Sequence, residues 1–287
     1  MTDATSRGNG RLVGALLVAP ATLLLLLLYV VPMVGLGRMA FNETGPTGAM
    51  IEAWSFSTFV TTLGDPFTLE LTWNSVWLSL VSTTLALVLA YPLALFLFRT
   101  RSRLKALLTV LAVAPMLVSG VVRVFGWLAL LGDRGLVNSL LVGLGLTSQP
   151  QRLVYNYFGV AIGLAESLMP YMILALVSGF GRLDRSFEEA AASLGATPWR
   201  VFRRVTLPLS LPAVVLGYLL CFVLAMSSYV TPKLLGGGRV FLLATEIYEH
   251  ANTNVNWPAA AALALYALVL IGLITAAYSA LTRRVER

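Results

Sequence analysis

The chain has 287 residues, of which 58% are hydrophobic and only 11% are charged, and its mean hydropathy is +0.83. A soluble domain carries about 25% charged residues, so this composition indicates a membrane protein and excludes a disordered chain and most soluble enzymes. The single cysteine, Cys221, excludes a disulfide scaffold. The net charge of +7 fits basic cytoplasmic loops, and we expect no nucleic-acid partner.

Six apolar segments are long enough to cross a lipid bilayer, which takes about 20 helical residues. Charged residues delimit them: the segments lie between Arg11 and Arg38, Glu70 and Arg99, Lys105 and Asp133, Arg152 and Arg182, Arg204 and Lys233, and His250 and Arg283. The first is too long to be the apolar region of a cleaved signal peptide. The sequence therefore predicts an all-α polytopic membrane protein with six transmembrane helices.

Basic residues are distributed unequally between the two sides of these spans. Fourteen of the 20 Lys and Arg residues fall in the tail 1–11, in the loops after the second and fourth spans, and in the tail 283–287. Five fall in the opposite loops, and Arg123 lies within a span. Because cytoplasmic loops carry the excess of Lys and Arg, both termini are predicted to be cytoplasmic tails that flank a transmembrane domain of residues 12–282.

Arg123 and Glu166 are the two ionisable residues inside predicted spans, where a charge is costly and therefore marks pairing or function. Either they form an ion pair, or Arg123 extends towards the outer surface. In the functional alternative, Glu166 accepts a cationic substrate on a translocation route, assisted by cation–π contacts with Trp127, Tyr171 and Tyr229. An aromatic anchor at the membrane interface is a further interpretation of Tyr229.

The cytoplasmic loop at residues 182–206 is too polar to cross the membrane, yet its sequence predicts regular structure. Ser186 and Glu189 have the spacing of a capping box, which begins a helix by satisfying free backbone N–H groups. Ala190–Ala192 form a face of small residues that a partner can approach closely, and Gly195 ends the helix.

A second short helix is predicted to follow in the same loop. Thr197 and Pro198 match an N-cap followed by a proline in the first helical position, and this helix extends to Arg204. The loop then forms a helix–turn–helix platform with Phe187 and Phe202 free to fill a pocket. The alternative is an amphipathic pair of helices lying on the membrane surface.

Signatures of catalysis are missing from the sequence. There is one histidine, no G-x-S-x-G, and no G-x-x-x-x-G-K-[ST] phosphate-binding loop. We therefore expect neither an enzyme nor a bound cofactor or metal ion. A transporter, a channel and a structural membrane partner remain as classes.

The spacing within the cytoplasmic loop resembles the EAA motif of ATP-binding-cassette (ABC) importer permeases, E-A-A-x₃-G-x₉-I-x-L-P. Here the motif consists of Glu189, Ala190, Ala191, Gly195, Val205, Leu207 and Pro208, with Val205 in place of isoleucine. The position of the motif between the fourth and fifth of six spans also resembles that family.

Further segments resemble the spermidine/putrescine permeases, particularly their B-type subunits. These segments are Asn74–Ser75, Tyr91–Ala94, Val122–Trp127, Leu131–Asn138, Pro170–Leu174 and Leu235–Gly237. The resemblance covers roughly residues 70–282. It implies the MetI-like fold of type I ABC importer permeases in the bacterial inner membrane, and half of a translocation pathway for a polyamine.

The resemblance also implies partners. Glu189, Ala190, Ala191, Gly195, Leu207 and Pro208 are expected to couple this chain to an ATPase dimer, which binds ATP and Mg²⁺ in its place. A second permease subunit, such as a C-type paralogue, and a periplasmic or extracytoplasmic solute-binding protein complete the expected assembly. A permease for an amino-acid derivative or a phosphonate, and a secondary transporter, are the alternatives.

Overall fold

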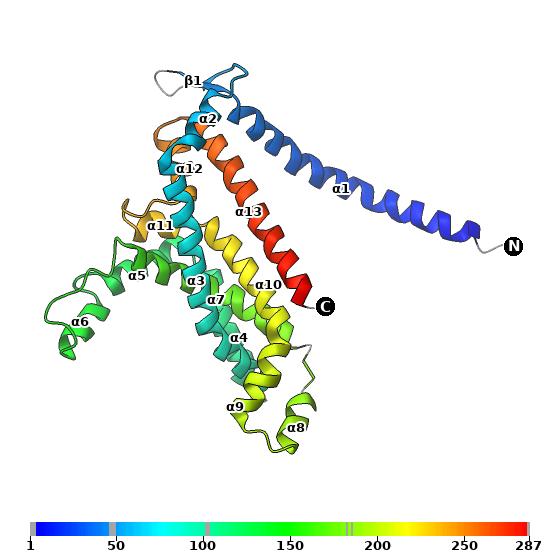
Figure 1. Ribbon diagram of the computed structural model, residues 1–287, viewed down its shortest axis with the longest axis vertical. Coiled ribbons are helices and arrows are strands. Elements are labelled where there is room, and N and C mark those ends of the chain that lie inside the picture. The colour runs from blue at the N-terminus through cyan, green and yellow to red at the C-terminus, as the bar shows by residue number, and fades with distance from the viewer. Residues whose placement is uncertain (1–3, 46–49, 101–103, 182, 185, 286–287) are drawn as a thin grey trace. The chain divides into compact units, whose positions relative to one another are not determined.

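The computed structural model describes residues 4–45, 50–100, 104–181, 183–184 and 186–285 (Figure 1). Of the basic residues used to predict orientation, Arg101, Arg103, Arg182, Arg185 and Arg287 lie outside this part of the chain. The chain divides into two compact units. They are Met1–Asp65 with Glu249–Tyr266, and Pro66–Tyr248 with Ala267–Arg287.

The first unit combines a long apolar helix with a short hairpin. Its elements are α1 (Ala4–Ala40), β1 (Glu43–Thr44), β2 (Met50–Ile51), α2 (Ser57–Gly64), the π-helical turn η3 (Glu249–Thr253) and the N-terminal part of α13 (Trp257–Val285). β1 and β2 pair antiparallel, with Glu43 opposite Ile51. Ala40, Ala261 and Ala262 form a small core within this unit.

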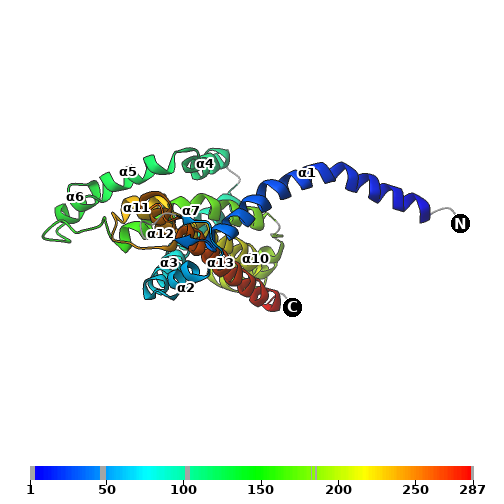
Figure 2. The same ribbon diagram turned by 90° about the horizontal axis from the view of Figure 1, so that it is seen from above.

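The second unit is a bundle of helices. Its elements are α3 (Pro66–Arg99), α4 (Leu104–Val113), the 3₁₀ turn η1 (Ala114–Leu117), α5 (Gly120–Leu131), α6 (Leu136–Gly143), α7 (Tyr157–Phe180), α8 (Ser186–Ser193), α9 (Pro198–Val201), the π-helical turn η2 (Phe202–Thr206), α10 (Leu207–Met226), α11 (Val230–Leu235), α12 (Leu243–Tyr248) and the C-terminal part of α13. Figure 2 shows α4, α5 and α6 following one another along one side of α7.

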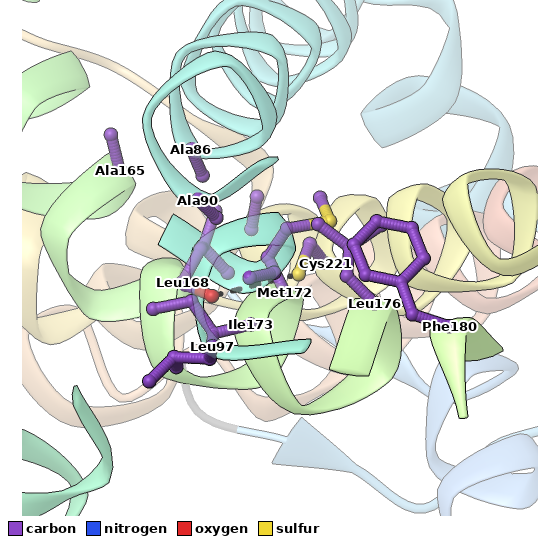
Figure 3. Packing of buried hydrophobic residues seen from close by; sticks show 12 residues of the cluster. Ala86, Ala90, Leu97, Ala165, Leu168, Met172, Ile173, Leu176, Phe180 and Cys221 are labelled. Atoms are coloured by element: carbon purple, nitrogen blue, oxygen red, sulfur yellow. Dashed lines mark hydrogen bonds between the residues drawn. The ribbon is translucent and has the colours of Figure 1, made fainter. Parts of the chain in front are cut away.

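Small residues allow α3, α7 and α10 to pack closely at the centre of this bundle. Ala86, Ala90 and Ala94 recur at helical spacing on α3 and are fully buried against α7. Figure 3 shows Met172 of α7 beside Cys221 of α10, whose buried Sγ lies 3.7 Å from the Leu168 carbonyl oxygen. Between helices in lipid there is no hydrophobic driving force, so the van der Waals contacts of this close approach stabilise the bundle instead.

The predicted spans are confirmed as helices, with one correction. Five continuous helical segments are long and apolar enough to cross a membrane: Leu16–Ala40, Pro66–Arg99, Tyr157–Phe180, Pro198–Met226 and Trp257–Ala280. The third predicted span is instead broken into Leu104–Leu117 and Gly120–Gly143, which meet at an angle of 99°. With this bent pair counted as one span, the described chain has six.

Two features cause the break in the third span. Pro115 has no N–H to continue the hydrogen-bond ladder of α4, so the helix tightens into the 3₁₀ turn η1. The next two residues, Val118 and Ser119, are extended, with ψ of 136° and 132°. Helix α5 then starts in a new direction, and Arg123 lies in its first turn, where its N–H donates to the Ser119 carbonyl.

Candidate functional site

The loop at 182–206 contains two short helices, α8 and α9, as the sequence predicts, but α9 ends at Val201 and the stretch up to the predicted end at Arg204 is a π-helical turn. The start of α8 differs from the predicted capping box, because Ser186 is the first helical residue rather than the cap. Asp184 takes the capping role instead, since its Oδ1 accepts the Ser186 backbone N–H at 2.9 Å. The Arg182 and Arg185 positions of the predicted loop lie outside the described residues.

The hydrogen bonds that Asp184 accepts from the backbone and the side chain of Ser186 lower the pKa of its carboxyl group. A lowered pKa in the folded state means that the charged carboxylate stabilises the fold. The contribution is therefore present at neutral pH, and it is lost only as the pH falls through the lowered pKa.

Gly195 ends α8 in the manner that the sequence predicts. Its φ of +80° lies in the left-handed region, which glycine enters without a steric penalty. The Ala196 N–H donates to the Ala191 carbonyl and the Gly195 N–H donates to the Ala192 carbonyl, at 3.1 and 2.9 Å. These two bonds form a Schellman motif, which satisfies the last carbonyl groups of the helix and reverses the chain towards α9.

The motif residues on α8 are accessible. Glu189 and Ala190 are exposed and Ala191 is half-buried. Phe187 is exposed as predicted, but Phe202 is not free: its ring stacks on Trp199 and makes a T-shaped contact with Tyr91, with ring centroids 5.4 and 6.0 Å away.

Leu207 and Pro208 lie where the platform joins α10. Thr197 precedes the first helical residue, Pro198, as predicted, although its hydroxyl makes no capping bond. Beyond α9 the chain continues through the π-helical turn η2 into α10, and the Leu207 N–H donates to the Phe202 carbonyl five residues earlier. Pro208 has no N–H of its own to donate, which favours the wider turn at this point.

Glu188 is a functional candidate that the motif did not indicate. Its Oε1 accepts from Arg99 Nη2 at the end of α3, at 2.9 Å, and from the Thr206 hydroxyl at 2.6 Å. Arg99 Nη2 also lies 3.5 Å from Thr206 Oγ1. The Glu188 side chain thus reaches the ends of the transmembrane helices, while the neighbouring Glu189 is exposed.

Arg123 and Glu166 form an ion pair between α5 and α7. Arg123 Nη1 lies 3.2 Å from Glu166 Oε1 and 3.4 Å from Oε2, and the two side chains are 20% and 25% exposed. Arg123 Nε is buried and has no hydrogen-bond partner among the described residues. The break before α5 is what brings the guanidinium group to the carboxylate.

The three predicted aromatic residues occupy different positions relative to this ion pair, and their contacts with a cationic substrate stay a prediction. Trp127 packs against the buried cluster that includes Leu131 and Leu164. Tyr171 follows Glu166 by five residues on α7, which is ~140° around the helix. Tyr229 instead stacks on Tyr248, with ring centroids 4.1 Å apart.

Comparison with known proteins adds the following. Residues 82–287 match the family described as binding-protein-dependent transport system inner membrane component. The spermidine/putrescine transport system permease protein PotB of Haemophilus influenzae is 34% identical over 230 residues, which cover 79% of this chain and 80% of that protein. PotB of Escherichia coli is 32% identical over 218 residues, covering 76% and 79%.

A solved structure has the same fold. The bacterial ABC transporter involved in the import of the acidic polysaccharide alginate contains a chain that superimposes with a TM-score of 0.69, over 99% of both chains. The sequence identity is 19%, so this likeness concerns the fold and not the solute.

Proposed function

The chain belongs to the family of binding-protein-dependent transport inner membrane components, and is thus a permease subunit of an ABC importer. From this premise we propose that its solute is a polyamine such as spermidine or putrescine. The observation that carries the proposal is the 34% identity with a spermidine/putrescine permease over most of both chains.

The exposed side of α8 is the proposed docking surface for a separate ATPase dimer, which supplies the bound ATP and Mg²⁺. Ala190 and Ala191 leave room for a groove to close around the helix, and Gly195 permits the sharp exit. Glu189 is exposed and available to a basic group of the ATPase. Leu207 and Pro208 join this surface to α10.

A second permease subunit completes the proposed pathway, and a solute-binding protein delivers the polyamine to it. The similarity to B-type polyamine permeases favours a related C-type paralogue as that second subunit. The family description itself names dependence on a binding protein.

Glu166 is the proposed acceptor for an ammonium group of the passing polyamine. The carboxylate lies beside a broken helix, a feature that often lines binding sites in transporters. Arg123 holds the same carboxylate when no substrate is present, so the Glu166 charge stays paired before an ammonium group arrives. Trp127, Tyr171 and Tyr229 keep a lesser proposed role along the route.

Uptake of radiolabelled spermidine tests the solute. The chain, co-expressed with its ATPase, second permease and binding protein in cells that lack polyamine uptake, is expected to restore accumulation that depends on ATP. Unlabelled putrescine should compete, and an amino acid or a phosphonate should not. Competition by one of those solutes and not by polyamines would contradict the polyamine assignment.

Replacing both members of the intramembrane ion pair separates substrate binding from packing. Glu166→Gln alone leaves Arg123 unpaired. Polyamine uptake should therefore fall whether Glu166 binds the substrate or only pairs with Arg123 in the packed bundle. The double variant Glu166→Gln with Arg123→Gln has no unpaired charge, and we expect it to assemble normally while polyamine uptake stays reduced by about tenfold, or ~1.4 kcal/mol. Uptake by the double variant at the level of the unmodified complex would assign Glu166 to packing alone.

A further inference from the structure

Helix α8 has an unusual attachment to the rest of its unit. None of its residues is buried, so it contributes no side chain to a hydrophobic core through which it could push on the transmembrane helices. A docking helix must nevertheless pass its movement to the membrane-spanning segments. The side-chain hydrogen bonds that the structure shows between α8 and the transmembrane helices converge on Glu188.

The carboxylate of Glu188 joins α8 to two different transmembrane elements. Its Oε1 accepts from the guanidinium group of Arg99, the last residue of α3, and from the hydroxyl of Thr206, the last residue of η2. The Glu188 side chain is 24% exposed and Thr206 is only 1% exposed. Because a buried hydroxyl needs a partner, the Thr206 bond holds Glu188 in one orientation.

A second contact joins α3 and α10 further along these helices from α8. The Tyr91 hydroxyl of α3 and the Ser210 hydroxyl of α10 are 2.9 Å apart. The Tyr91 ring also makes T-shaped contacts with Phe180, at the end of α7, and with Phe202. A displacement applied at Glu188 therefore acts on α3 and α10 together and on α7 through the aromatic contacts.

We propose that Glu188, Arg99 and Thr206 are positioning residues for transport, which transmit the movement of α8 to α3 and α10. In this arrangement Glu189 and Ala190 face the ATPase, while the neighbouring Glu188 faces the transmembrane helices. The inference rests on the proposed docking of α8, and it is independent of which solute the importer carries.

The test uses the whole importer reconstituted in liposomes, with ATP hydrolysis and solute uptake measured on the same sample. Glu188→Gln and Arg99→Gln should leave assembly with the ATPase and basal ATP hydrolysis intact. Solute imported per ATP hydrolysed should fall by roughly 3- to 30-fold. Thr206→Val, which keeps the shape and removes the hydroxyl, should give a smaller fall. Glu52→Gln is the matched control, since Glu52 is an exposed carboxylate in the other unit.

Exchange of the two charges identifies the pair itself as the connection. Arg99→Glu and Glu188→Arg should each reduce the uptake per ATP, and the two together should recover part of it. The proposal is overturned if the single variants transport as efficiently as the unmodified complex, or if the exchanged pair recovers nothing. It is also overturned if Glu188→Gln reduces assembly while the complexes that do form remain fully coupled.

A further variant, Gly195→Val, which distorts the end of α8, keeps this result separate from the docking proposal. Normal coupling in Glu188→Gln together with lost coupling in Gly195→Val would reject the role of Glu188 and retain the docking of α8. Normal coupling in both would reject the docking of α8, and with it this inference.

Discussion

Replacing Gly195 with valine is expected to reduce solute uptake by at least about tenfold, while the chain still inserts into the membrane. The residue has a φ of +80°, where a β-branched side chain is strained by ~1–2 kcal/mol. Relief of this strain breaks the two bonds that end α8 and changes the direction in which the chain leaves it. Uptake and basal ATP hydrolysis by the reconstituted importer measure the effect.

Gly195→Asn is the control for this variant, because asparagine tolerates the left-handed conformation that valine does not. A Cβ atom at Gly195 would meet nothing within 4 Å, so the two variants differ in backbone conformation and not in a local clash. Asparagine should keep most of the uptake. Equal loss in both variants would mean that the bare surface at Gly195 matters, and not the shape of the turn.

Replacing Gly179 with alanine is expected to destabilise the bundle and lower the yield of assembled importer. A Cβ atom at this position of α7 would lie 2.0 Å from the Cβ of Ala213 and 3.2 Å from its Cα, so α7 and α10 would have to separate. Overpacking of this kind costs about 1–3 kcal/mol or more. The thermal unfolding midpoint of the detergent-purified complex measures it.

Gly272→Ala provides the matched control, since a Cβ atom there has no neighbour within 4 Å. That substitution should leave the midpoint unchanged or raise it slightly, because alanine favours helix over glycine. Adding Ala213→Gly to Gly179→Ala removes the opposing methyl group and should recover most of the loss. An unchanged midpoint in Gly179→Ala alone would contradict the close packing of α7 on α10.

The features that sequence analysis predicted correctly depend on local patterns. Long apolar segments between charged residues marked all the spans, because a bilayer excludes charge over a fixed length. Gly195 was predicted as the end of α8 because few other residues adopt its conformation. The pairing of Arg123 with Glu166 was one of three predicted alternatives, and it follows from the cost of a lone charge inside the membrane.

The features that it missed depend on contacts between distant segments. Arg99 and Glu188 are 89 residues apart, so no spacing rule connects them. The motif singled out Glu189, and nothing local to α8 showed that the preceding Glu188 contacts Arg99 and Thr206. Asp184 and Ser186 are both plausible caps by residue type, and in the structure Asp184 accepts the Ser186 N–H.

The bend in the third span was missed for a related reason. Proline occurs inside four other helical spans of this chain, α1, α3, α7 and α10, and each of these continues through it. At Pro115 the two extended residues that follow turn a possible kink into a break. The aromatic side chains proposed around Glu166 were grouped by chemistry alone, and they lie in three places: Tyr171 shares α7 with Glu166, Trp127 shares α5 with Arg123, and Tyr229 stacks on Tyr248 of α12.

The burial of Cys221 has a practical consequence for following this importer at work. The only thiol of the sequence lies in the core between α7 and α10, out of reach of water-soluble maleimides in the folded chain. A cysteine introduced at Phe187 or Trp199, both exposed, would then be the sole labelling position on this subunit. Fluorescent or spin probes attached there can report on the coupling surface during turnover without a prior cysteine-free background.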